Sequence, residues 1–210
     1  MVITYTEEIN GINYTFSADE SLRLLAEPLL ECLEYDIAKE KVRDGFRIAS
    51  GFTTFMLSKH GDGYDIAAPD YTDDPLTALT TDLTLALHIQ YRQVFLLRKL
   101  GLVGKAVNYY DIIVVAKGAL EKENVYMQRY NDEDIKGWVI NSYEHNENGK
   151  AAPAEDNEYE TIRAYELIKL RPELVDVLCL PDDYIAVFEG KELKAVLNEN
   201  NDDLLEKNDK

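Results

Sequence analysis

The longest helical pattern of the chain lies between two stretches of strand-like sequence. Apolar residues recur with the 3.6-residue helical period over residues 76–97. Asp74-Pro75 favours a helix start and Gly101 favours its end, so the pattern predicts one helix of about 25 residues. A helix between strand-rich stretches packs its apolar face against a sheet. The pattern therefore predicts an α+β fold of mostly antiparallel sheets with helices packed on one face, with two packed subdomains as an option.

The N-terminal half is predicted to form two hairpins. Apolar side chains alternate on both sides of Asn10-Gly11, which is typical of a hairpin over residues 2–16. Residues 46–57 are rich in β-branched and aromatic side chains and predict a strand, which Gly61-Asp62-Gly63 turns back. A helical stripe at residues 22–33 contains Pro28, where we expect a kink or a restart. We interpret residues 1–105 as an N-terminal α+β domain of unknown family.

The C-terminal half has its own strand and helix patterns. A continuous apolar run at residues 112–116 is typical of a buried central strand. Helical spacing broken by Pro172 predicts two short helices, at residues 162–168 and 174–178. The remaining segments are two strands at 125–130 and 137–143, a mobile polar loop at 144–158, and a last hairpin at 184–196. We interpret residues 106–197 as a second α+β domain and residues 198–210 as an acidic flexible tail.

Charge restricts the partners that the chain can bind. Of 210 residues, 40 are acidic and 22 are basic, which gives a formal charge of -18. Such a protein repels phosphate backbones and anionic lipid, so we expect a basic protein as partner, and neither nucleic acid nor membrane. The sequence shows neither a secretory signal nor an apolar run long enough for a membrane span, which favours a cytoplasmic location. The two cysteines, Cys32 and Cys179, are predicted to be buried core thiols.

No segment carries a recognised catalytic motif, so we expect neither enzymatic activity nor a cofactor. The run Gly101-Leu-Val-Gly104-Lys105 lacks the glycine spacing and the hydroxyl residue of a phosphate-binding loop. Glu144-His145-Asn146-Glu147 offers metal ligands, but no second cluster completes a coordination shell, so no metal site is predicted. A hydrolase that uses loop carboxylates stays open as the least favoured alternative.

Acidic loops are the candidate partner-binding surface. Nine acids and two lysines lie between Asp132 and Glu160, several of them beside tyrosines, which supply contact area at low entropic cost. The alternative is that these acids only keep the protein in solution. Strands on both sides of Gly137 form a predicted hairpin, which should bring the candidates within reach of one partner. The candidates are Asp132, Glu133, Asp134, Glu144 and Glu147, with Tyr130 and Tyr143 as anchors.

Short motifs in the second half resemble a known family. They are Val114–Leu120, Val125-Tyr-Met-Gln-Arg129, an acid before Gly137-Trp138, Thr161-Ile-Arg-Ala-Tyr-Glu-Leu, Pro172-Glu-Leu and Leu180-Pro181. Over residues 110–190 this pattern resembles the immunity proteins of bacterial polymorphic toxin systems. The resemblance implies a small cytosolic α+β protein that binds a toxin domain and blocks its active surface without catalysis. A regulatory or stress-related binding module unconnected to toxins is the alternative. Trp138 is predicted to be buried, because it lies in an alternating strand beside Val139 and Ile140.

Overall fold

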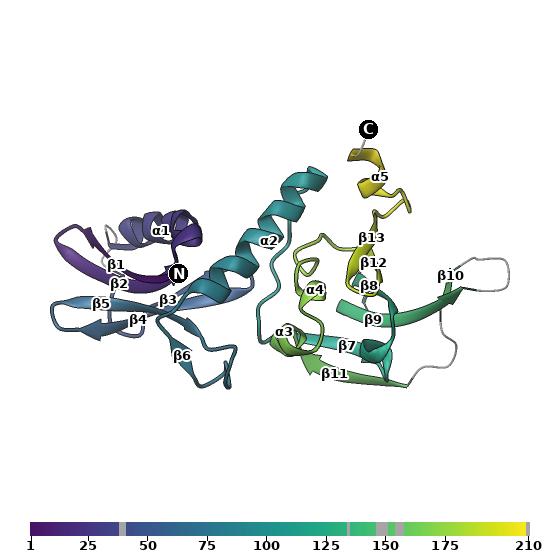
Figure 1. The fold of residues 1–210 in the computed structure, drawn as a ribbon, viewed down its shortest axis with the longest axis horizontal. Coiled ribbons are helices and arrows are strands. Elements are labelled where there is room, and N and C mark those ends of the chain that lie inside the picture. Colours follow the sequence, from purple (N-terminus) through teal and green to yellow (C-terminus); the bar gives the residue numbers. More distant parts are fainter. Residues whose placement is uncertain (38–40, 134, 146–150, 154–157, 209–210) are drawn as a thin grey trace. The chain divides into compact units, whose positions relative to one another are not determined.

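The computed structural model describes residues 1–37, 41–133, 135–145, 151–153 and 158–208. Contacts divide the chain into two compact units, Met1–Arg92 and Gln93–Lys210, and the division falls inside helix α2 (Thr84–Leu100). Each unit is built on one sheet, and each sheet is antiparallel except for one parallel strand pair. The predicted α+β fold is confirmed (Figure 1).

The first unit contains a sheet with the strand order β1-β2-β5-β4-β3, and the short strand β6 pairs with β5. Its large core side chains include Tyr14, Phe16, Phe55 and Ile66, which come from alternate positions of β2, β4 and β5. The strands are β1 (Val2–Ile9), β2 (Ile12–Asp19), β3 (Arg47–Ser50), β4 (Thr53–His60), β5 (Gly63–Pro69) and β6 (Leu79–Thr80), and the helices before α2 are a 3-10 helix (Glu20–Ala26) and α1 (Glu27–Ile37).

The first hairpin and the break at Pro28 are confirmed. Asn10 and Gly11 both have positive φ, which is the backbone that a two-residue hairpin turn requires. Pro28 is the second residue of α1, where a missing N–H costs no helical hydrogen bond. The prediction of one strand over residues 46–57 is wrong, because Gly51 turns the chain at φ +58° and separates β3 from β4. The strand β4 then returns as β5 through Gly61-Asp62-Gly63, as predicted.

The long helix is shorter than its apolar pattern. Asp74 starts only a turn, where its carboxylate accepts hydrogen bonds from the backbone N–H of Leu76 and the hydroxyl of Thr77. The chain then forms β6, and α2 begins at Thr84, whose N–H donates to the Asp82 carboxylate at 3.0 Å. The predicted start at Asp74 is therefore wrong, and the predicted end is confirmed, because Gly101 follows α2 with φ +67°.

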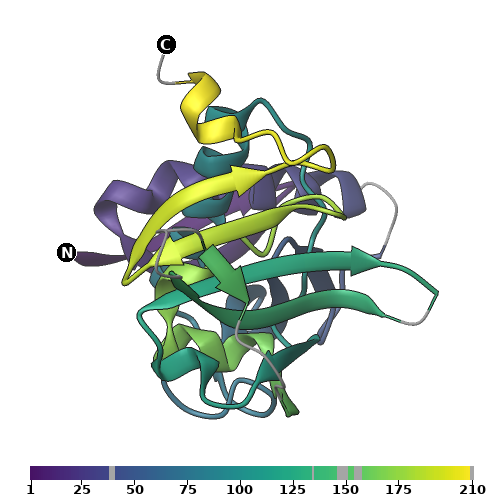
Figure 2. The same ribbon diagram turned by 90° about the vertical axis from the view of Figure 1, so that its right-hand side faces the viewer.

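The second unit contains a sheet with the strand order β11-β7-β9-β8-β12-β13, and β10 pairs with β9. Figure 2 shows β13, β12, β8 and β9 from top to bottom, with the β8–β9 hairpin reaching beyond its neighbours at one end. The strands are β7 (Ile112–Ala116), β8 (Asn124–Asn131), β9 (Lys136–His145), β10 (Ala151–Pro153), β11 (Tyr159–Arg163), β12 (Ile185–Glu189) and β13 (Glu192–Leu197). The helical segments are 3-10 helices at Ala119–Glu121 and Ala164–Glu166, and α3 (Leu167–Leu170), α4 (Pro172–Val175) and α5 (Leu204–Asn208).

Most predictions for this unit are confirmed, and three need correction. The run at 112–116 is an interior strand between β11 and β9, and Pro172 separates two short helices. Ile162 lies in β11 and not in a helix, because it pairs with Ile113 of β7. Within the predicted loop 144–158, β10 pairs with the end of β9, and residues 146–150 and 154–157 lie outside the described residues. The predicted flexible tail contains α5, whose entry is fixed by the Asp203 carboxylate accepting from the N–H of Leu205.

The second sheet has two faces of different character. Val125, Met127 and Arg129 of β8 point to the inner face together with Trp138 and Ile140 of β9, and all five are buried. Figure 1 shows α3 and α4 on one side of this sheet, and the indole N–H of Trp138 donates to Leu178 just after α4 at 3.1 Å. The burial predicted for Trp138 is confirmed, with 2% of the residue exposed. The opposite face, here called the outer face, is described below.

Candidate protein-binding site

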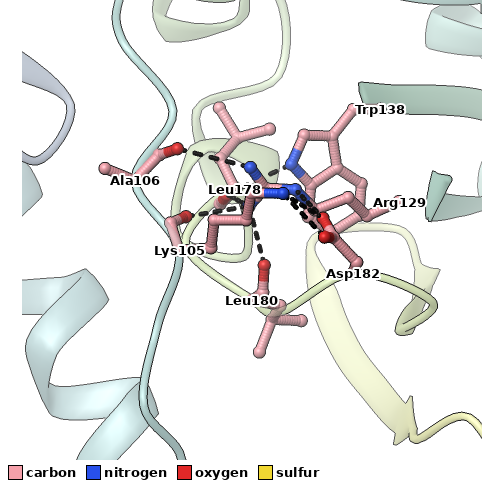
Figure 3. A network of polar contacts seen from close by, with 7 residues as sticks. All are labelled: Lys105, Ala106, Arg129, Trp138, Leu178, Leu180 and Asp182. Atoms are coloured by element: carbon pink, nitrogen blue, oxygen red, sulfur yellow. Dashed lines mark hydrogen bonds and ion pairs between the residues drawn. The ribbon is translucent and has the colours of Figure 1, made fainter. Parts of the chain in front are cut away.

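A buried arginine connects the inner face of the second sheet to two loops. Arg129 is 5% exposed, and its Nη1 donates to the carbonyls of Lys105 and Leu180, both at 2.8 Å (Figure 3). Longer hydrogen bonds of 3.3 Å reach the carbonyls of Ala106 and Leu178. A guanidinium has five N–H donors in a rigid plane, so one side chain can satisfy this many acceptors from separate segments.

The charge of Arg129 is balanced inside the same network. Its Nε lies 3.2 Å from Oδ1 of Asp182, and the Nζ of Lys105 lies 2.6 Å from Oδ2 of the same carboxylate. The guanidinium also lies 5.8 Å from the centre of the Trp138 ring. Burial lowers the pKa of Arg129 and the charge of Asp182 raises it, while a guanidinium stays protonated in proteins. The network therefore holds residues 105–106 and 178–182 against β8 and β9. In this way it stabilises the conformation of these two loops.

Arg171 connects a second set of segments in the same way. Its Nη1 donates to the carbonyl of Lys122 at 2.9 Å, and its Nη2 donates to the carbonyl of Gly190 in the β12–β13 turn at 2.6 Å. Its Nε pairs with the Glu173 carboxylate, and both side chains are 12% exposed. Arg129 and Arg171 thus both donate to backbone carbonyls of the unit itself.

Three tyrosines meet on the outer face of the sheet. Tyr126 and Tyr130 alternate with buried residues of β8, and Tyr159 comes from β11 at the sheet edge. The Tyr159 hydroxyl donates to Oδ1 of Asn141 at 3.0 Å, and Asn141 also hydrogen-bonds to Tyr126. The Tyr130 hydroxyl donates to Oε1 of Gln128 at 2.7 Å. We call Tyr126, Tyr130 and Tyr159 the tyrosine cluster.

The tyrosine cluster interacts electrostatically with Asp132 in the turn that follows β8. Burial raises the pKa of Tyr126, and Tyr130 and Tyr159 raise it further by their own charge when ionised. Burial also raises the pKa of Tyr130, with further contributions from Tyr159 and from the carboxylate of Asp132. The hydroxyls of Tyr126 and Tyr130 are therefore uncharged at neutral pH, and the carboxylate of Asp132 acts on Tyr130.

A comparison with protein-family models identifies this unit. The Imm33-like domain model, which describes an immunity-protein family, matches residues 92–199, slightly more than half of the chain. The chain belongs to the Imm33-like family. The match begins at Arg92, one residue before the second unit, and it covers both arginine networks. It confirms and extends the resemblance read over residues 110–190. No curated protein and no solved structure matches the chain.

The Imm33-like domain separates the acidic candidates predicted from sequence. Asp132 and Glu133 are exposed in the β8–β9 turn, where the Asp132 N–H donates to the carbonyl of Ile135 at 3.0 Å. Glu144 is exposed near the other end of β9, eight residues from Lys136, which is about 27 Å along a strand. The hairpin is present, but it places these acids at its two ends and not side by side, and their reach to one partner stays a prediction. Asp134 and Glu147 lie outside the described residues.

The two predicted tyrosine anchors of the Imm33-like domain differ in exposure. Tyr130 is half-buried on the outer face, beside the acidic turn. Tyr143 is 6% exposed, and its hydroxyl donates to the carbonyl of Phe188 in β12, so its ring offers little area to a partner. Sequence reasoning missed Tyr126, Gln128 and Asn141, and it noted Tyr159 only as a tyrosine beside acidic residues. Tyr126, Gln128 and Tyr130 lie at alternate positions, and this spacing predicts one polar face of the strand. The position of Tyr159 beside them depends on the order of strands in the sheet, which the sequence pattern does not reveal.

Among the described residues, no group of three or more histidine, cysteine, aspartate and glutamate side chains could hold a metal ion. No helix in the described part of the chain is long and apolar enough to cross a membrane.

Proposed function

We propose that this chain is a cytoplasmic immunity protein, which binds a basic toxin domain and neutralises it without catalysis. The observation that carries the proposal is the match of the Imm33-like domain to nearly the whole second unit. The buried polar groups of that unit support a non-enzymatic role, because Arg129 and Arg171 are occupied by backbone carbonyls and carboxylates of the fold. Such groups hold a surface in shape and are not available to a substrate.

The charge of the chain supports a basic partner. Residues 93–210 contain 24 acidic and 15 basic side chains, and the first unit is acidic as well. A net negative field accelerates the encounter with a positively charged protein and slows the encounter with nucleic acid or anionic lipid. We place the first contact at the acidic turn formed by Asp132 and Glu133, because both side chains are exposed at the hairpin end that reaches beyond the neighbouring strands (Figure 2).

Toxicity rescue tests the proposed function. Each toxin domain encoded in the native genome is expressed in a bacterial host with and without the full chain. Restored growth with one of these toxins, together with a complex of the two purified proteins, is the expected result. Rescue of none of them contradicts the proposal and favours a regulatory binding module.

Charge reversal tests the acidic turn once that toxin is known. Asp132→Lys with Glu133→Lys should lower the association rate several-fold at low salt and flatten its salt dependence, because rim charges act mainly on association. Thermal unfolding should stay nearly unchanged, since both side chains are exposed. The control, Glu199→Lys with Glu206→Lys, reverses two exposed charges elsewhere in the same unit. Equal effects of the two pairs contradict the acidic turn as the contact.

A further inference from the structure

The tyrosine cluster has features of a preformed contact surface. Its hydroxyls are held by the side chains of Gln128 and Asn141, so two of the rings are fixed in orientation before any partner arrives. Tyr159 is nevertheless 52% exposed, and Tyr126 and Tyr130 are half-buried. Fixed aromatic rings on a surface lose little conformational entropy on binding, which is why tyrosine is frequent at the energetic centres of interfaces.

There is open space beside the cluster. Gly137 of β9 pairs with Tyr130, and a Cβ added at Gly137 would meet no atom within 4 Å. On the neighbouring strand β7, Val114 pairs with Val139 of β9 in parallel register. Two residues earlier on each of these strands, Ile112 lies beside Gly137. Ile112 is 55% exposed. The surface between the Tyr130 ring and Ile112 can therefore receive a side chain from a partner.

The chemistry around this space fits a cation. Gln128 is half-buried and accepts from the Tyr130 hydroxyl through an amide oxygen that has a second lone pair, and Asp132 adds a negative charge beside Tyr130. Asn141 is buried, and its oxygen holds the hydroxyl of Tyr159. Glu158 and Glu160 flank Tyr159 in sequence, and both are exposed. Two bases of the same region are already engaged, because Lys117 pairs with Glu158 and the Arg163 guanidinium donates to the carbonyl of Tyr110.

We propose that the tyrosine cluster, with Gln128, is the docking site for an arginine side chain of the toxin. This inference rests on the proposed function and names the contact that it uses. Arginine is the residue that matches these groups, because its flat guanidinium stacks on aromatic rings while its N–H groups donate to oxygen acceptors in the same plane. An acidic side chain or a phosphate would meet the amide oxygen of Gln128 and the carboxylate of Asp132, which repel it.

A titration tests the site without the toxin. N-acetyl-arginine amide is added to the full chain at millimolar concentrations, and tyrosine ring signals are followed by NMR. Saturable shifts at Tyr126, Tyr130 and Tyr159 are expected, with none at Tyr35, which is 59% exposed in the first unit. The uncharged citrulline analogue has nearly the same shape and should cause at most a tenth of these shifts. Equal shifts with both compounds, or shifts confined to other residues, overturn the proposal.

Variants then test the site in the complex. Tyr159→Ala should weaken toxin binding by about tenfold or more, as expected for an aromatic residue at an interface centre. Tyr159→Phe keeps the ring and should stay within about threefold of the original affinity, because the stacking contribution remains. Tyr35→Ala is the exposed-tyrosine control, expected to change affinity less than twofold. An unchanged Trp138 emission spectrum shows that each variant keeps its fold.

The two levels of the proposal fail in different ways. If the original chain neutralises a toxin and Tyr159→Ala binds it as tightly as Tyr35→Ala does, the arginine site is wrong and the immunity function stands. If N-acetyl-arginine amide binds at the cluster and the chain neutralises no toxin, the immunity function is wrong and the cluster is a site for another basic protein.

Discussion

The Arg129 side chain alone donates to backbone carbonyls that would otherwise each need a separate hydrogen-bond donor. Four carbonyls from residues 105, 106, 178 and 180 point at it, and none of these residues is in a strand of the sheet. Buried carbonyls without donors are costly, so the arginine allows loop backbone to pack against a sheet. Three residues from the family-like motifs, Arg129, Trp138 and Leu180, meet in this network, although sequence reasoning assigned a role only to Trp138.

Removing this side chain should destabilise the second unit strongly. We expect Arg129→Met to lower the free energy of unfolding by about 3–5 kcal/mol, because it leaves buried carbonyls without a donor and removes one of the two cations that pair with Asp182. Urea unfolding followed by Trp138 fluorescence reports this unit, since Trp138 is the only tryptophan in the sequence. Lys117→Ala, which breaks an exposed pair with Glu158, should cost about 0–1 kcal/mol. A loss as small for Arg129→Met as for this control contradicts a supporting role.

The two cysteines should react at very different rates. The prediction that both are buried is wrong for Cys32, which is exposed on α1 among glutamates, and right for Cys179. Burial raises the pKa of Cys179 to about 12, and only the thiolate reacts with disulfide reagents. At pH 8 we expect one thiol per chain to react with Ellman's reagent in the native protein and two in denaturant. Cys32→Ser should remove the native reaction, and a remaining fast phase would contradict the burial of Cys179.

Elements whose geometry is set by adjacent residues could be predicted, and those set by distant pairing could not. Asn10-Gly11 determines its own turn, so the first hairpin was readable. Asp74-Pro75 is also a favourable local signal, in this case for a helix start. However, Ala68 of β5 pairs with Thr80, so residues 79–80 form a strand and the helix cannot begin before them. The apolar period continues through that strand, so only the sheet reveals where α2 begins.

The true start of α2 gives a test at the same scale. Asp82→Ala should reduce the stability of the first unit by about 0.5–2 kcal/mol, because the Asp82 carboxylate accepts hydrogen bonds from the N–H and the hydroxyl of Thr84. Far-UV circular dichroism during thermal unfolding measures this change. Asp62→Ala, in the exposed β4–β5 turn, removes the same charge and should stay within about 0.5 kcal/mol. A smaller effect at Asp82 than at Asp62 contradicts the capping role.

On the scale of the whole molecule, the acidic charge is shared equally by the two units. Residues 1–92 contain 16 acids and 7 bases, and residues 93–210 contain 24 and 15, which is the same excess of nine. Apart from Arg92, the Imm33-like model matches only the second unit, so half of the net negative charge lies in a unit outside the match. Long-range attraction depends on net charge, and the first unit therefore adds to the attraction for a basic partner whether or not it touches that partner.

The candidate site could be predicted from sequence only in its local parts. Exposed acids after β8 and the ring of Tyr130 follow from a short hairpin, and these are the residues that the structure places side by side. Tyr159 joins Tyr130 because β11 lies beside β7 and β7 beside β9, although about thirty residues separate the two tyrosines in sequence. Glu144 is closer to Tyr130 in sequence and far from it along the strand. Strand order, which sequence patterns leave open, decides which candidates share a surface.

The second unit should lose stability at high pH, because several of its tyrosine hydroxyls and its buried thiol have a higher pKa in the folded state than in the unfolded chain. Burial raises the pKa of Tyr126, Tyr130, Tyr143, Tyr184 and Cys179. Unfolded tyrosine has a pKa of about 10, so above that pH the unfolded chain binds fewer protons than the folded chain, and stability falls as pH rises. The urea midpoint followed by Trp138 fluorescence should be level between pH 7 and 8, begin to fall near pH 9 as the Cys179 thiol ionises in the unfolded chain, and fall more steeply above pH 10. Tyr126→Phe should make this decline shallower, since phenylalanine has no proton to lose. An unchanged midpoint up to pH 11 would show that these hydroxyls ionise in the folded unit as they do in the unfolded chain.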